Sequence, residues 1–202
     1  MNHVHELLKQ GLARFDLDLP LDPWVLYLEL LMKWNKAYNL TAIREPEHII
    51  TKHFFDSLAL LPWLLGPRIL DVGSGAGFPG IPLALARDDC YFTLLDSNGK
   101  KIRFLREVQR ALGLHHVTVI QSRAEDHRPA KAYHTIMSRA VGDLPTLLSW
   151  TEHLVDPHGQ WLLMKGHAPC DELSSITKPY RVETYGVAGI EGARSCIIIN
   201  NQ

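Results

Sequence analysis

Residues 69–80 read Ile-Leu-Asp-Val-Gly-Ser-Gly-Ala-Gly-Phe-Pro-Gly, and this stretch decides the fold. It predicts a short buried strand that ends near Asp71, a loop that contains Gly73, Gly75 and Gly77, and a helix that follows at once. Because glycine lacks a Cβ, the backbone N–H groups of such a loop can approach a ligand closely. This order of strand, loop and helix indicates a nucleoside-bearing cofactor, and therefore group transfer rather than simple binding.

The sequence around this stretch divides into a helical part and an alternating part. Residues 1–66 are helical in pattern, whereas short apolar runs alternate with helical patterns in residues 67–202, which is typical of βαβ units. The last two runs leave no room for a helix between them, so we expect an antiparallel hairpin. We therefore predict an α/β fold, with a helical extension (1–66) packed on a sheet domain (67–202). The expected strands are Arg68–Val72, Tyr91–Asp96, Val117–Gln121, Thr135–Arg139, Trp161–Lys165, Val182–Val187 and Cys196–Asn200.

Composition and charge restrict the class of protein. The formal net charge is −1, so any contact with nucleic acid must use a local basic patch. Three widely separated cysteines are typical of reduced thiols and of a cytoplasmic protein. The first residues lack an apolar signal core, and the longest apolar run is too short to span a membrane. The eleven histidines are scattered without zinc spacing, so no metal site is expected.

The glycine-rich loop permits two interpretations. Gly75-Ala-Gly77-Phe-Pro-Gly80 satisfies the dinucleotide pattern G-x-G-x-x-G, which would suit an NAD-dependent oxidoreductase. In the other interpretation, Asp71 lies two residues before Gly73, as in S-adenosylmethionine-dependent methyltransferases. An acid here attracts a sulfonium and an ammonium group, whereas it would repel a pyrophosphate. A Tyr-x-x-x-Lys motif for hydride transfer is also absent, so the sequence favours S-adenosyl-L-methionine.

Further candidate residues follow the predicted strands, where open parallel sheets bind their ligands. Asp96 ends the second strand and suits the ribose hydroxyls, although a helix N-cap is its structural alternative. Ala124 and Glu125 follow the third strand and can border an adenine, or form a solvated turn. Arg139 and Lys165 end the fourth and fifth strands, where a transferase holds its reactive atoms, although each alone could equally be an ordinary surface charge.

One helix carries the strongest basic surface of the sequence. Lys100, Lys101, Arg103, Arg106 and Arg110 crowd this segment, and Glu107 is the single acid among them. A surface of this kind can contact phosphates, and an ordinary solvated face is the alternative interpretation.

Several of these motifs together resemble one known family. The series resembles the small-subunit ribosomal RNA guanine-N7 methyltransferases, also called glucose-inhibited division protein B, over about residues 20–199. The motifs are Asn39-Leu-Thr-Ala, His53-Phe-Phe-Asp56-Ser57, residues 71–80, Asp96-Ser-Asn-Gly-Lys-Lys101, Ser122-Arg-Ala-Glu125, Ser138-Arg-Ala140 and Lys165-Gly166.

The resemblance implies a class I S-adenosylmethionine-dependent methyltransferase with a Rossmann-like sheet of seven mostly parallel strands, the last one antiparallel. It also implies that 16S ribosomal RNA, or a precursor of the small subunit, is the partner. The implied cofactor contacts include Gly73, Phe78, Ala124, Glu125 and Arg139. Asp71, Gly75 and Asp96 complete the predicted cofactor site.

The expected chemistry is direct in-line methyl transfer without a covalent intermediate. Guanine N7 already holds an in-plane lone pair and needs no general base, and the end of the fourth strand offers neither a cysteine nor a carboxylate. Arg139 is the candidate catalytic residue and would place the guanosine. The expected RNA contacts are Asn39, His53, Lys100, Lys101, Arg103, Arg123 and Lys165.

Several alternatives remain open at this point. The enzyme could methylate another RNA, a protein or a small molecule. A non-catalytic ribosome-assembly factor that senses the cofactor is also compatible with the motifs. No heptad run suggests an obligate protein partner, so a monomer is expected.

Overall fold

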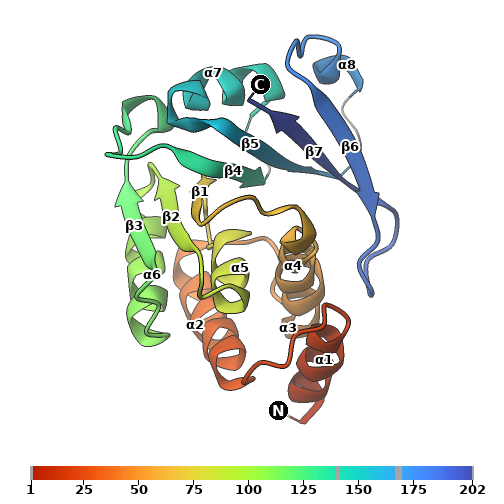
Figure 1. Cartoon of the computed structure of the whole chain (residues 1–202). Helices are drawn as coiled ribbons and strands as arrows, with labels where there is room; N and C mark the ends of the chain where they lie inside the picture. The colour runs from red at the N-terminus through yellow and green to blue at the C-terminus, as the bar shows by residue number, and fades with distance from the viewer. Residues whose placement is uncertain (1, 140–141, 167–169, 202) are drawn as a thin grey trace.

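Seven strands form one mixed sheet in the computed structural model, which describes residues 2–139, 142–166 and 170–201 (Figure 1). The strand order is β3-β2-β1-β4-β5-β7-β6. All neighbouring pairs from β3 to β5 are parallel, whereas β7 runs antiparallel between β5 and β6. The strands are β1 (Arg68–Val72), β2 (Tyr91–Asp96), β3 (Val117–Gln121), β4 (Tyr133–Arg139), β5 (Val155–Lys165), β6 (Tyr180–Tyr185) and β7 (Arg194–Asn200).

The sequence pattern located the strands well and misjudged some of their limits. The bounds of β1, β2 and β3 agree with the prediction, and β6 and β7 form the expected hairpin. Strand β5 begins at Val155, six residues early, because its polar first half still pairs with β4 across a register shift. Strand β6 ends at Tyr185 instead of Val187. Val187 lies in the hairpin turn, buried against the core, which explains its apolar character.

Helices cover the two faces of the sheet (Figure 1). On one side lie α5 and the N-terminal helices, and α7 lies on the other side. The π-helix continues α3 and runs directly into α4. The helices are α1 (Asn2–Ala13), α2 (Asp22–Tyr38), α3 (Pro46–Ile49), the π-helix η1 (Ile50–Phe55), α4 (Asp56–Leu58), η2 (Leu61–Trp63), α5 (Gly80–Ala86), α6 (Gly99–Ala111), η3 (Ala124–Asp126), α7 (Leu144–Thr151), η4 (Glu152–Leu154) and α8 (Cys170–Leu173).

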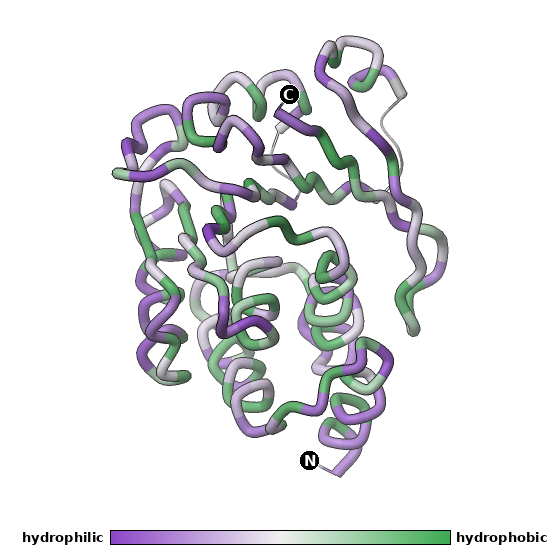
Figure 2. The backbone as a smooth tube through the Cα atoms, in the orientation of Figure 1, coloured by the Kyte–Doolittle hydropathy of each residue, from purple (hydrophilic) through white to green (hydrophobic). Residues whose placement is uncertain are grey.

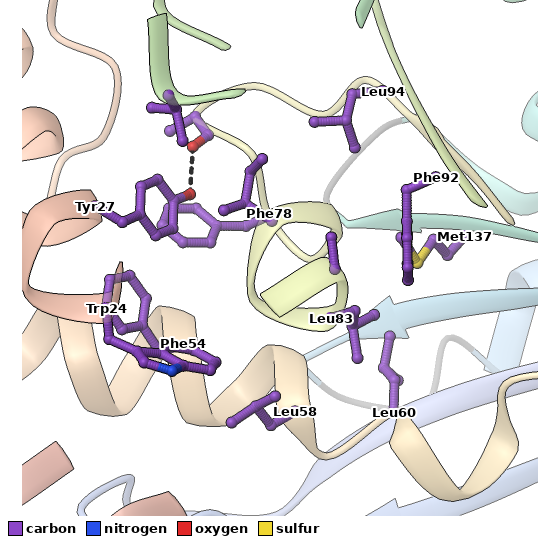
Figure 3. Packing of buried hydrophobic residues seen from close by; sticks show 14 of the residues in the cluster. Trp24, Tyr27, Phe54, Leu58, Leu60, Phe78, Leu83, Phe92, Leu94 and Met137 are labelled. Atoms are coloured by element: carbon purple, nitrogen blue, oxygen red, sulfur yellow. Dashed lines mark hydrogen bonds between the residues drawn. The ribbon is translucent and has the colours of Figure 1, made fainter. Parts of the chain in front are cut away.

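The N-terminal helices share their hydrophobic core with the sheet domain (Figure 3). Tyr27 of α2 stacks on Phe54 of the π-helix with 5.1 Å between ring centroids, and Phe54 lies 6.0 Å from Phe78 of the glycine-rich loop. The buried Tyr27 hydroxyl donates a 2.6 Å hydrogen bond to the carbonyl of Ala76 in the same loop. Burying each such aromatic side chain contributes about 1.5–3 kcal/mol. Packing and hydrogen bonding by the N-terminal helices therefore hold the glycine-rich loop in place.

Helix α6 shows how one element serves both the core and the surface. The Asn98 side chain caps it by accepting a hydrogen bond from the N–H of Lys100. Ile102, Leu105 and Val108 recur at helical spacing and are buried. Hydrophobic and hydrophilic residues alternate along α6 in Figure 2, as expected for a helix with one buried face.

Two predictions fall partly outside the described residues. Ala140, the last residue of the Ser138–Ala140 motif, is one of them. The side chain of Cys170 is the other, whereas Cys90 and Cys196 are free and buried, as the prediction of reduced thiols expects.

Candidate functional site

The glycine-rich loop crosses the carboxyl end of β1 and is fixed by backbone hydrogen bonds. The N–H of Gly73 donates to the carbonyl of Leu95 on β2, at 2.8 Å. Gly77 has φ +96°, and a Cβ at this position would lie 2.8 Å from the Tyr27 hydroxyl oxygen. A larger residue at this position would therefore strain the backbone and push the loop away from the core.

Asp71 at the end of β1 is a fully buried carboxylate with one unused oxygen. Its Oδ2 accepts a 3.0 Å hydrogen bond from the N–H of Gly80, whereas Oδ1 has no hydrogen-bond partner in the described structure. Burial raises the pKa of Asp71 to about 7, although the N–H of Gly80, the nearby Ser74 hydroxyl and the charge of Arg139 act in the opposite direction. A buried unpaired oxygen is costly, so this position suits an incoming cationic donor such as an ammonium group.

A first cavity, the adenosine-side cavity, opens beside the loop at the ends of β2 and β3. It measures about 200 Å³ and brings together five predicted residues, Gly73, Asp96, Arg123, Ala124 and Glu125. Trp150 of α7 also lines it. The sequence gave no signal for Trp150, since an apolar residue in a helix is usually part of the core.

Asp96 links the cavity to the loop. Its Oδ2 accepts from the N–H of Gly75 at 3.0 Å, and its Oδ1 accepts from the N–H of Asn98 at 2.8 Å. The ammonium of Lys101 lies 3.6 Å from Oδ2. Lys101, predicted to contact RNA, is therefore directed toward Asp96, away from the outer face of α6.

A second cavity, the acceptor-side cavity, lies at the ends of β4 and β5 and measures about 420 Å³. Its walls come from the N-terminal helical segment, from these two strands and from the β6–β7 hairpin. It brings together three residues predicted from the sequence, His53, Arg139 and Lys165. The full lining is Ile43, Lys52, His53, Asp56, Arg139, Met164, Lys165, Gly166, Tyr185 and Arg194.

Arg139 lies between this cavity and the glycine-rich loop. Its guanidinium carbon is 5.0 Å from the centre of the Phe78 ring, within cation–π range. Its NH1 nitrogen donates to the carbonyl of Lys52 at 3.3 Å and lies 3.7 Å from Oδ2 of Asp56. Arg139 therefore contacts both the glycine-rich loop and the wall of the acceptor-side cavity.

His53, predicted to contact RNA, lines this cavity but is 8% exposed. Its ring stacks on Phe78 with 4.5 Å between centroids, and its Nε2 is 2.8 Å from Oγ1 of Thr41. Burial, followed by the charge of Arg139, lowers the pKa of His53 to about 3. The imidazole is therefore neutral at physiological pH and helps to position Phe78.

Sequence reasoning missed a cluster formed by Asp56, Tyr185 and Arg194. The Asp56 side chain is 3% exposed, and its Oδ1 accepts a 3.2 Å hydrogen bond from the Tyr185 hydroxyl. The Nε of Arg194 lies 3.5 Å from the same oxygen. Burial raises the pKa of Asp56, whereas Arg194 and Arg139 lower it. One signal was available, because Asp56 belongs to the His53-Phe-Phe-Asp56-Ser57 motif that carries the family resemblance, although no role was predicted for it.

The other predicted RNA contacts lie outside these cavities or make internal pairs. Asn39 is the left-handed C-cap of α2, with φ 47°, and its backbone N–H donates to Asn35. Lys100 and Arg103 are exposed on the outer face of α6. Lys165 lines the acceptor-side cavity while its ammonium pairs with Glu172 at 3.1 Å.

The described residues were compared with the requirements of a metal site and of a membrane-spanning helix. Within the described residues, no group of three or more His, Cys, Asp or Glu side chains is placed to hold a metal ion. None of the helices in that part of the chain has the length and apolar character needed to cross a membrane.

The chain is similar to proteins of one named family. A family model described as "rRNA small subunit methyltransferase G" (GidB) matches residues 22–195. A protein named ribosomal RNA small subunit methyltransferase G from Legionella pneumophila (strain Philadelphia 1) is 54% identical over 98% of this chain and 95% of its own length. One of the same name from Escherichia fergusonii is 43% identical over 87% of this chain and 86% of its own.

Solved structures confirm the predicted fold. A SAM-dependent methyltransferase from Aquifex aeolicus superimposes with a TM-score of 0.59 at 17% identity, over 81% of this chain and 97% of its own. A putative O-methyltransferase from Klebsiella pneumoniae gives a TM-score of 0.60 at 15% identity, over 87% of this chain and 90% of its own. The sheet is that of the class I methyltransferases.

Proposed function

Since the chain belongs to the rRNA small subunit methyltransferase G family, we propose that it methylates N7 of a guanosine in 16S ribosomal RNA, with S-adenosyl-L-methionine as cofactor. The observation that carries this proposal is a pair of cavities at the carboxyl ends of the strands, one beside Gly73 of the glycine-rich loop and one beside Arg139, together with the buried, unpaired Oδ1 of Asp71. This arrangement suits a cationic nucleoside on one side and an acceptor base on the other.

The adenosine-side cavity offers the groups that would hold the cofactor. Asp96 would accept hydrogen bonds from the ribose hydroxyls, and Ala124 and Glu125 would border the adenine. Asp71 would pair with the ammonium through Oδ1. When bound, the cofactor supplies an activated methyl group on a sulfonium cation.

The residues of the acceptor-side cavity position a nucleotide rather than move protons. Guanine N7 attacks with its own lone pair, so the neutral His53 and the ion-paired Asp56 need not act as bases. Arg139 would orient the guanosine next to the loop. Orientation of this kind lowers barriers by as much as about 7–11 kcal/mol.

The charges around the acceptor-side cavity suit an RNA strand. Lys52, Arg139, Lys165 and Arg194 line it together with one acid, Asp56. Because N7 lies in the deep groove of A-form RNA, the target guanosine must be unpaired or splayed out. The exposed basic face of α6 and Arg123 would contact neighbouring phosphates.

Transfer of label to mapped RNA tests this function. Small ribosomal subunits from cells that lack the protein are incubated with it and with methyl-labelled cofactor, and the RNA is cleaved at N7-methylguanosine after borohydride and aniline treatment. We expect one labelled guanosine. Label on another atom or only on protein, or no label at all, would contradict the proposal.

Two further observables separate the alternatives. S-adenosylhomocysteine is expected to raise the melting temperature, whereas NADH is not, which distinguishes a methyltransferase from an oxidoreductase. The proposal also includes a cytoplasmic monomer. Sedimentation of the purified protein as a dimer would contradict that part alone.

A further inference from the structure

We propose that Asp56 reads the Watson–Crick edge of the acceptor guanine, through the N1–H and N2–H₂ donors, while Arg139 contacts O6. Asp56 would thereby be the residue that selects guanine over adenine. This inference rests on the proposed function and names the recognition element of the same acceptor-side cavity.

The Asp56 carboxylate has unused capacity to accept hydrogen bonds. It lines the cavity, and the Tyr185 hydroxyl donates a 3.2 Å hydrogen bond to it. The nearest nitrogens of Arg194 and Arg139 stand at 3.5 and 3.7 Å, as ion pairs. Consistent with this, the buried Nε of Arg194 makes no hydrogen bond in the described structure. An ionised carboxylate offers about four acceptor sites.

Guanine is the base whose edge matches this pair of groups. It presents two adjacent donors, N1–H and N2–H₂, next to the acceptor O6. A carboxylate complements the two donors and a guanidinium complements O6. Adenine presents an acceptor at N1 and a donor at N6, so it would leave Asp56 without donors and would face Arg139 with an amino group.

Arg139 is the neighbour of Asp56 in the cavity wall and also contacts the glycine-rich loop. It lies 3.7 Å from Asp56, and its guanidinium carbon is 5.0 Å from the ring of Phe78, a loop residue that does not itself line the cavity. Around guanine the order is N2, N1, O6 and then N7. A base with N1 and N2 at Asp56 and O6 at Arg139 therefore directs N7 toward the loop.

The remaining walls suit a flat base held at one edge. Ile43 and Met164 supply apolar surface, and the volume of about 420 Å³ lies within the usual range of ligand pockets. Tyr185 and Arg194 approach the carboxylate from the β6–β7 hairpin and hold it in one orientation. Their role is to position Asp56.

Asp56→Asn tests the inference on small subunits that lack the modification. The amide places an N–H₂ group against donors of guanine, so we expect kcat/KM to fall by about 10–100-fold. The affinity for S-adenosylhomocysteine should stay within about twofold, because Asp56 does not line the adenosine-side cavity. Asp156→Asn is the matched control, since Asp156 also pairs with an arginine, Arg68 at 3.3 Å, at the far end of the sheet. Equal activity of Asp56→Asn and wild type would overturn the inference.

A second measurement needs no protein variant and so does not depend on folding. Subunits are reconstituted around a ligated 16S RNA in which inosine replaces the acceptor guanosine, which removes N2 and keeps O6 and N7. We expect wild-type kcat/KM to fall about 10-fold, after normalisation to the dimethyl sulfate reactivity of each base. Asp56→Asn should lose less activity on inosine than on guanosine, because inosine lacks the N2 donor and keeps only the N1–H contact with Asp56. Equal wild-type rates on both bases would overturn the inference, whereas no methylation of guanosine itself would overturn the proposed function.

Discussion

Asp71→Asn is expected to stabilise the cofactor-free protein while it weakens cofactor binding. Burial raises the pKa of Asp71 from 3.8 to about 7. The unfolded chain therefore releases this proton near pH 4 and the folded protein only near pH 7, so stability falls as the pH rises through this interval. At roughly 1.4 kcal/mol per pH unit the loss reaches about 4 kcal/mol above pH 7. Asparagine does not ionise and avoids this loss.

The same substitution is expected to act oppositely on the cofactor. Oδ1 of Asp71 would otherwise accept a charge-assisted hydrogen bond from the ammonium, worth about 1.5–3 kcal/mol. We therefore expect the Kd for S-adenosylhomocysteine to rise by about 10–100-fold at pH 8. Below pH 6 the wild-type carboxyl is protonated, so the affinities of the two proteins should converge.

Urea denaturation without cofactor at pH 4 and pH 8, combined with calorimetric titration of S-adenosylhomocysteine, measures both effects. The variant should match wild type at pH 4 and exceed it by up to about 4 kcal/mol at pH 8. Asp156→Asn, which breaks the ion pair with Arg68, should give no gain at pH 8. A variant less stable than wild type at pH 8, or one with unchanged affinity at that pH, would refute the reasoning.

Three further variants test other parts of the site. Gly80→Ala would bring a Cβ within 2.7 Å of the Asp71 carboxylate. We therefore expect the free energy of unfolding, measured by urea denaturation, to fall by about 1–3 kcal/mol, and cofactor binding to weaken. Unchanged stability would contradict this. Arg139→Ala should reduce methyl transfer about 100-fold while circular dichroism shows the fold retained, and wild-type turnover would exclude its positioning role. The double variant Arg103→Glu, Arg106→Glu should raise KM for small subunits and weaken the dependence of KM on salt concentration, with kcat unchanged. An unaltered salt dependence would show that α6 does not contact the RNA.

The residues of the proposed cofactor site could be predicted from the sequence because they follow neighbouring parallel strands. Strands β1, β2 and β3 are parallel neighbours, so the residues that follow them must gather at one edge of the sheet. Gly73, Asp96 and Ala124 were found in this way, and they do line one cavity. Local sequence sufficed because each residue comes directly after an apolar strand.

The acceptor-side cavity was harder to predict from the sequence, because its residues come together only in the tertiary fold. Asp56 and Tyr185 are 129 positions apart, and Arg194 reaches them because β7 inserts between β5 and β6. No spacing rule connects these segments. His53 lines the same cavity, as a predicted site residue, and its ring also stacks on Phe78, a contact that the sequence does not reveal.

The helical segment formed by η1 and the start of α4 contributes side chains both to the hydrophobic core and to the acceptor-side cavity. The π-helix η1 and the first residue of α4 supply Phe54 to the core, His53 to Phe78 and Asp56 to the cavity wall. Phe54 and His53 are themselves packed, so the backbone that carries Asp56 has little freedom to move. Methylation of a base that needs no proton removed depends mainly on placing that base accurately. A recognition residue mounted on the core, rather than on a surface loop, meets that requirement, because sites need positioning within roughly 0.5 Å.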